Sequence, residues 1–120
     1  MAASTPTINQ NIKPGDGSVV LSTWTLTTAD PEGGWFEWAQ WADRCGTAFG
    51  TWGGATLTWQ GSNDGTNAFT LSNAAGGTAA TQTADGGKQL LELPLYVRPK
   101  LTSVGVGATV VAELCAVRKK

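Results

Sequence analysis

One stretch of the sequence constrains the fold more than any other: residues 50–65, which read GTWGGATLTWQGSNDG. Apolar residues at every second position, Ala55, Leu57 and Trp59, alternate there with polar ones, which is the period of a strand with one buried face. The segment GSNDG follows directly, and its Asn, Asp and Gly residues favour the positive-φ conformations of tight turns. The alternation resumes at Phe69. We therefore predict a β-hairpin at the centre of the domain.

The same patterning predicts further strands along the chain, at residues 18–28, 43–49, 78–83 and 108–117. The segment 89–95 is interrupted by Pro94 and is interpreted as an edge strand or a single helical turn. Residues 30–34, DPEGG, have the composition of a loop. Apolar residues occupy both faces of 108–117, which predicts a strand that is central in its sheet or covered by a partner.

About eight short strands without a helical stretch predict an all-β chain, a single-domain antiparallel β-sandwich or jelly roll. The residues expected in its core share the apolar face of a period-2 strand. They are Trp24, Leu57, Trp59, Phe69, Leu71, Val110 and Leu114.

The sequence divides into an extended N-terminal arm (1–17), the sandwich domain (18–117) and a basic C-terminal tail (118–120). The arm contains Ile8 and Ile12 but otherwise has too little apolar content to pack on its own domain. It is interpreted either as a disordered tail or as an arm that becomes ordered against a partner. The N-terminus has neither the basic nor the apolar segment of a secretion signal, so we expect synthesis in a cytosol.

The most unusual segment is WFEWAQW at residues 35–41, with four large aromatic side chains in seven residues. It fits a strand, or a helical turn that gathers its tryptophans on one side. Its aromatics, Trp35, Phe36, Trp38 and Trp41, are interpreted either as ordinary core packing or as a surface patch that contacts another protein.

Composition excludes several classes of function. A net charge of −1 with 14% charged residues does not indicate a nucleic-acid or anionic-membrane partner. The chain has no His, which is the commonest general base and metal ligand. Most of the acidic residues that a glycosidase pair would need stand beside Gly or Pro, where they normally form turn hydrogen bonds. We therefore predict a protein that is not an enzyme, with no cofactor and no metal.

The two cysteines, Cys45 and Cys115, are too few for a disulfide framework and lack metal-ligand spacing. Synthesis in a cytosol favours free thiols over a disulfide, and this inference rests on the compartment alone. We expect the two cysteines to stay unbridged.

Two binding functions from different classes remain. A β-sandwich with several tryptophans is compatible with a carbohydrate-binding module, in which aromatic rings stack on sugar faces. Such a module is normally secreted, whereas this N-terminus has no secretion signal. The other class is a structural protein that binds protein.

Several motifs favour the structural class. They are Asp43-Arg44, GTWGGATLTWQGSNDGT at residues 50–66, Thr70-Leu71, YVRP at residues 96–99 and a glycine-bearing turn before the last strand. Together they resemble the head decoration, or cementing, proteins of tailed bacteriophages. The resemblance covers about residues 18–117, with the Trp-rich segment and Cys45 as departures from the family's pattern.

The resemblance implies a β-rich subunit that binds the outside of an assembled capsid and stabilises it. It implies the major capsid protein as partner, self-association as a dimer or trimer, and a location on the virion after synthesis in the bacterial host cytoplasm. An accessory head or tail role is the alternative within the same class. We expect the contacts to come from the arm and the Trp-rich segment, through Ile8, Ile12, Trp35, Phe36, Trp38 and Trp41.

Overall fold

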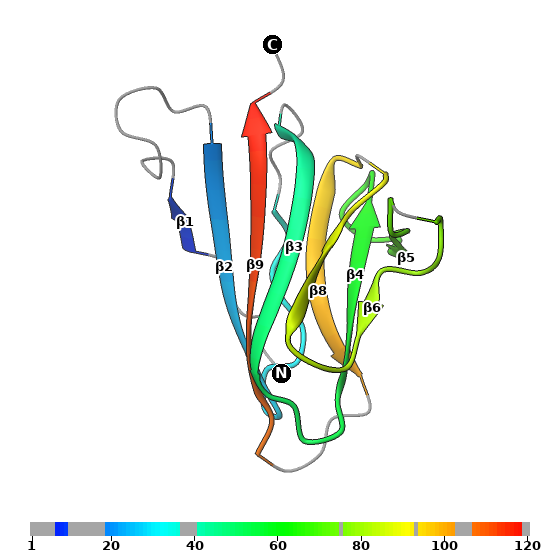
Figure 1. Ribbon diagram of the computed structural model, residues 1–120. Helices are drawn as coiled ribbons and strands as arrows, with labels where there is room; N and C mark the ends of the chain where they lie inside the picture. The colour runs from blue at the N-terminus through cyan, green and yellow to red at the C-terminus, as the bar shows by residue number, and fades with distance from the viewer. Residues whose placement is uncertain are drawn as a thin grey trace.

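A computed structural model of the protein describes residues 7–9, 19–36, 41–74, 76–92, 94–102 and 107–118. The elements it forms among them are all β-strands: β1 (Thr7–Asn9), β2 (Val19–Thr27), β3 (Trp41–Thr51), β4 (Thr56–Ser62), β5 (Phe69–Thr70), β6 (Thr81–Gln82), β7 (Gly86–Gln89), β8 (Tyr96–Thr102) and β9 (Thr109–Arg118). They form two antiparallel sheets (Figure 1). The prediction of an all-β antiparallel sandwich is confirmed.

The larger sheet has the strand order β1-β2-β9-β3-β7. Strand β9 pairs with β2 on one side and with β3 on the other, so it is central, as its two apolar faces predicted. The smaller sheet is built around β4, which pairs with β8 along one edge and with β5 and β6 along the other. The predicted hairpin is present, with Gln60 of β4 opposite Thr70 of β5.

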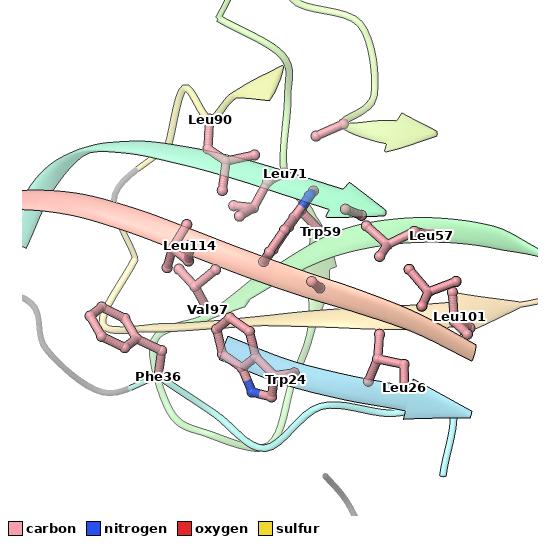
Figure 2. Packing of buried hydrophobic residues seen from close by; sticks show 14 of the residues in the cluster. Trp24, Leu26, Phe36, Leu57, Trp59, Leu71, Leu90, Val97, Leu101 and Leu114 are labelled. Atoms are coloured by element: carbon pink, nitrogen blue, oxygen red, sulfur yellow. The ribbon is translucent and has the colours of Figure 1, made fainter. Parts of the chain in front are cut away.

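The core lies between the two sheets and consists of side chains at alternate positions of the long strands (Figure 2). Trp24 of β2 and Trp59 of β4 meet edge to face across the gap, with ring centroids 5.9 Å apart and planes at 70°. This is one of the geometries that the charge distribution of aromatic rings favours. Leu57, Leu71, Val110 and Leu114 are also buried, as predicted.

Phe69 is the exception among the predicted core residues, since 41% of its surface is exposed. It lies opposite Gly61 in β5, a two-residue strand at the edge of the smaller sheet. Its ring approaches Gly61 on one side. An outermost strand has no neighbour to cover its other side, so alternation alone overestimated the burial of Phe69.

Gly46 of β3 is the point at which the two sheets approach most closely around Trp59. A Cβ on Gly46 would lie 2.6 Å from Cζ2 and 2.7 Å from Nε1 of the Trp59 indole, closer than real Cβ contacts allow. Gly46 is also buried, and its strand neighbour Ala48 is small. The large ring on β4 thus requires small residues on the facing strand, as dense core packing demands.

The segment predicted as a loop at residues 30–34 is paired with the smaller sheet. Gly33 donates a backbone hydrogen bond to Pro99 (2.9 Å), and Leu101 donates one to Pro31 (2.7 Å). Phe36 and Val97 exchange backbone hydrogen bonds of 2.7 and 3.0 Å. Residues 31–36 therefore lie antiparallel along β8, and the loop prediction for residues 30–34 is wrong for Glu32 and Gly33, which form bridges. Their Pro and Gly content fits an edge position.

The segment 89–95 follows the strand alternative only at its start. Strand β7 ends at Gln89, and Leu90 forms an isolated bridge with Asn73. Among its described residues there is no helical turn.

At the other end of the chain, Thr7–Asn9 of the arm pair with β2 as strand β1. The expectation that the arm does not pack on its own domain is wrong for these three residues, and the other residues of 1–17 lie outside the described ones.

Candidate interaction surfaces

The structure describes the side chains of only two of the six residues predicted to contact partners. Ile8 lies in β1 opposite Ser22, and Trp41 begins β3, but their side chains are outside the described part. Ile12 and Trp38 also fall outside it. Only Trp35 and Phe36 have described side chains, and they have opposite environments.

Phe36 is fully buried, so its prediction as a surface contact residue is wrong. Its backbone pairs with Val97, which turns its side chain into the space between the sheets (Figure 2). Trp35, one position earlier, is half-buried on the outer side. The two residues alternate as in a strand, which agrees with the strand alternative for this segment. The core-packing alternative therefore holds for Phe36, whereas Trp35 lies at the surface.

Trp35 belongs to a group of side chains on the outer face of the smaller sheet, which we name the aromatic–arginine cluster. Its members are Glu32, Trp35, Gln60, Tyr96, Arg98 and Lys100. Residues 96, 98 and 100 occur at alternate positions of β8, so the strand period places them on one face. Residues 31–36 run beside β8 and add Glu32 and Trp35 to the same face.

Arg98 is the centre of this cluster. Its guanidinium carbon lies 4.3 Å from the centroid of the Trp35 ring, a cation–π geometry. Nη1 lies 3.0 Å from Oε1 of Glu32, and Nε donates a hydrogen bond of 2.9 Å to Oε1 of Gln60. Lys100 Nζ lies 3.8 Å from the other Glu32 oxygen. Arg98 is therefore held in place from several directions.

Tyr96 extends the aromatic surface beyond Arg98. Its ring centroid lies 6.1 Å from that of Trp35, with the planes tilted by 57°. An arginine that is already held by an aromatic ring, a carboxylate and an amide loses little side-chain entropy when a partner contacts it. Trp, Tyr and Arg are also the residues that most often dominate the energy of protein interfaces. The cluster has the chemistry of a protein-binding surface.

Exposed large apolar side chains occur in two other places. Phe49 of β3 and Val111 of β9 lie opposite each other on the outer face of the larger sheet. Threonines surround them on this face, at positions 25, 47, 51 and 109. The second group consists of Phe69, which lies in the hairpin, and of Leu91 and Leu95, which lie in the β7–β8 connection.

The hairpin tip is organised by one carboxylate. Asp64 Oδ1 accepts hydrogen bonds from the backbone N–H groups of Thr66 (2.8 Å) and Asn67 (2.7 Å) and from the Ser62 hydroxyl (2.9 Å). Oδ2 accepts one from the Asn67 side chain (2.7 Å). These bonds, the Asn67 N–H above all, hold the pKa of Asp64 far below its usual value. Asp64 performs the turn-forming role expected from its sequence context.

Two more carboxylates accept hydrogen bonds, but from residues that are far from them in the sequence. Asp85 accepts hydrogen bonds from Trp52 Nε1 (2.9 Å) and the Gly50 N–H (3.0 Å), and these lower its pKa. The Ser72 N–H donates to Glu92 (2.6 Å) and lowers the pKa of that carboxyl. A glycosidase needs one carboxyl group with a raised pKa as its proton donor. These three groups are shifted in the opposite direction.

The tryptophans with described side chains present few free ring faces on which a sugar could stack. Trp24 and Trp59 are fully buried. Trp35 and Trp52 are half-buried, and the Arg98 guanidinium lies over the Trp35 ring, while the Trp52 N–H is bonded to Asp85. Sugar stacking needs a free ring face, so no observation on these four residues favours the carbohydrate-binding alternative.

Within the described part of the chain there is no pocket. Nor do these residues include a group of three or more His, Cys, Asp or Glu side chains arranged to hold a metal ion. None of the described residues forms a helix of the length and apolar composition that crossing a bilayer requires. No family model matches the sequence, and neither a curated protein nor a solved structure matches it.

Sequence reasoning located Trp35 but missed the rest of the aromatic–arginine cluster. A signal was available in YVRPK at residues 96–100, where Tyr96, Arg98 and Lys100 alternate with Val97 and Pro99. That pattern predicts one polar–aromatic face on a strand. The partner segment that supplies Glu32 and Trp35 was hidden by its loop-like composition.

Proposed function

We propose that this protein is a structural virion protein that binds the outside of a phage capsid and stabilises it. The observation that carries the proposal is the aromatic–arginine cluster on the outer face of the smaller sheet, because it combines the Trp, Tyr and Arg side chains that often dominate protein interfaces. The motif resemblance at residues 50–66 and 96–99 supports the same function and connects it to decoration proteins. YVRP at 96–99 contributes both to that resemblance and to the cluster.

A cementing role depends on how the binding free energies of individually weak contacts combine. Arg98 is already ordered by Glu32, Gln60 and Trp35, so a partner would meet a preorganised surface at low entropic cost. An icosahedral shell offers many identical sites, and an oligomer that engages several at once gains avidity from a modest single contact. The proposed partners are the major capsid protein and other copies of this chain, as a dimer or trimer.

The test is co-sedimentation of the purified chain with capsids assembled without it. Trp35→Ala should weaken capsid binding about 30-fold, which corresponds to the loss of roughly 2 kcal/mol at an interface hot spot. Phe49→Ala is the matched control, since it also removes an exposed aromatic ring, but from the larger sheet. It should bind like the wild type.

Each result has a distinct meaning, provided that both variants keep the near-ultraviolet circular dichroism of a folded domain. If Phe49→Ala weakens binding and Trp35→Ala does not, the contact lies on the larger sheet and the cluster is not the binding surface. If the wild type does not sediment with capsids at all, the cementing function is rejected. Sedimentation with tails instead would favour the accessory role.

A further inference from the structure

The structure brings together the two cysteines, which are 70 positions apart in the sequence. Cys45 of β3 lies directly opposite Cys115 of β9 in the larger sheet. Both are free thiols, Cys45 exposed and Cys115 half-buried. Gly46, next to Cys45, and Leu114 and Ala116, on either side of Cys115, are buried, so both thiols lie on the outer face.

The pair belongs to the continuous β3–β9 ladder, which runs from Cys45 opposite Cys115 to Thr51 opposite Thr109, and an irregularity in β3 lies just beyond it. The register shifts between Ala42, opposite Val117, and Cys45, opposite Cys115: three steps along β3 match two along β9. This is the count of a β-bulge, which inserts one residue into one strand. Residues 45–51 keep one register with β9, and this register places the two thiols at directly opposite positions on the same face of the sheet.

Directly opposite residues in an antiparallel pair have Cα atoms about 4.5–5.5 Å apart. Disulfides span Cα separations of about 4.4–6.8 Å, so the backbone geometry at this position is compatible with a bond. The Cβ atoms of such pairs lie slightly farther apart than an unstrained disulfide prefers. A bond here is therefore expected to be reducible, as strained and exposed disulfides are.

We propose that Cys45 and Cys115 are a thiol-modification site that closes to an intrachain disulfide when the protein meets a low-molecular-weight disulfide such as oxidised glutathione. The inference concerns what an oxidant does to two thiols that are free in the reduced chain. It stands apart from the capsid-binding proposal, because it depends only on the β3–β9 register.

The reaction proceeds by two exchange steps. The Cys45 thiolate attacks one sulfur of oxidised glutathione, forms a mixed disulfide and releases one glutathione thiolate. The Cys115 thiolate then attacks the Cys45 sulfur, forms the Cys45–Cys115 bond and releases the second glutathione. The two protein thiols are oxidised, one glutathione disulfide is reduced, and the two protons are taken up by the two glutathione thiolates.

The environment assigns the order of these steps. Cys45 is the exposed thiol and meets the reagent first. Burial raises the pKa of Cys115, and the nearby Cys45 and Glu113 raise it further. Cys115 is therefore the poorer external nucleophile and acts as the resolving thiol, for which proximity compensates. Leu21 of β2 and Gln89 of β7 flank the pair in the same row of the sheet.

The experiment uses the reduced, folded full chain in buffers of defined oxidised-to-reduced glutathione ratio. Samples are quenched with acid, alkylated under denaturing conditions and weighed by intact mass spectrometry. The expected product is a monomer lighter by two hydrogen atoms that takes up no alkylating reagent. At one glutathione ratio, the native chain should contain at least about tenfold more of it, relative to mixed disulfides, than the chain unfolded in denaturant.

Single variants provide the matched controls. Cys115→Ser should stop at one glutathione adduct on Cys45, and Cys45→Ser should react more slowly, since only the half-buried thiol remains. Near-ultraviolet circular dichroism verifies that both variants are folded. The proposal is overturned if the native wild type keeps two alkylatable thiols, accumulates two glutathione adducts or forms intermolecular dimers. Equal rates for the two variants would overturn the order of attack.

Discussion

Trp59 and Asp64 are five positions apart, yet they stabilise neighbouring parts of the same hairpin by different physics. Trp59 is fully buried, packs edge to face on Trp24 and presses against the backbone of Gly46 on the other sheet. Asp64 is exposed and orders the tip through hydrogen bonds to residues within three positions of itself. Trp59 therefore stabilises the fold through contacts between the two sheets, whereas Asp64 stabilises the hairpin tip through local hydrogen bonds.

The aromatic–arginine cluster lies between these extremes. Its side chains come from elements far apart in the sequence, as core contacts do, but they interact through charge and hydrogen bonds, as the hairpin tip does. Substitutions in the core should therefore destabilise the fold most, those in the cluster less and those at the hairpin tip least. Each of the following experiments can contradict that order.

The largest effect is expected for Trp59→Ala. Removing the ring leaves a cavity between the sheets and forfeits the contact with Trp24, which should lower the free energy of unfolding by about 3–5 kcal/mol. Denaturant unfolding followed by circular dichroism measures this loss. A loss below about 1 kcal/mol would show that Trp59 does not support the interface between the sheets.

Gly46→Ala tests the same contact between the sheets from the facing strand. Its new Cβ would overlap the Trp59 indole, so we expect a loss of about 1–3 kcal/mol in the wild-type background. In the Trp59→Ala background the obstructing ring is absent, and the same substitution should be close to neutral. A double-mutant cycle therefore gives a large coupling energy between positions 46 and 59. Additive losses would contradict the contact.

The part of the fold that was predicted from the sequence depends on one physical regularity. Strands β2, β4 and β9 each bury one face or lie in the middle of a sheet, so their side chains record the period that predicts them. The turn at the hairpin tip was also predictable, because Asp64 bonds to its own neighbours.

Other features of the fold could not be predicted from the local sequence pattern. Residues 31–36 pair with β8 through backbone groups, which any residue composition supplies. The pairing of Cys45 with Cys115 depends on the β3–β9 register, which alternation alone does not determine. The candidate site was only partly predicted for the same reason: Trp35 stood out as an aromatic, but its contact with Arg98 joins two segments that are over 60 positions apart.

An intermediate effect is expected for Arg98→Ala, about 1 kcal/mol of unfolding free energy. The substitution removes a partly exposed ion pair with Glu32 and the cation–π contact with Trp35, each of modest value. Arg98→Lys is the matched control: it keeps the charge but lacks the planar fork that bonds Glu32 and Gln60 at once. It should recover only part of the loss. Full recovery in denaturant unfolding would show that charge alone is sufficient.

The smallest effect, and the one that depends on pH, is expected for Asp64→Asn. The folded pKa of Asp64 is lowered, so its carboxylate contributes stability above the unfolded Asp pKa of about 3.9, and this contribution is lost as pH falls below that value. The variant should therefore melt below the wild type at about pH 7, and the difference in Tm should be smaller at about pH 2.5, because it narrows as the pH falls from the unfolded pKa toward the lowered folded pKa. Thr66→Ala is the matched control, since only the backbone N–H of Thr66 bonds to Asp64, and it should melt like the wild type at both pH values.

If the gap in Tm between wild type and Asp64→Asn is the same at both pH values, the ionised carboxylate does not order the tip. If that gap exceeds the loss in Trp59→Ala, the hairpin tip and not the contact between the sheets is the main support of this part of the fold.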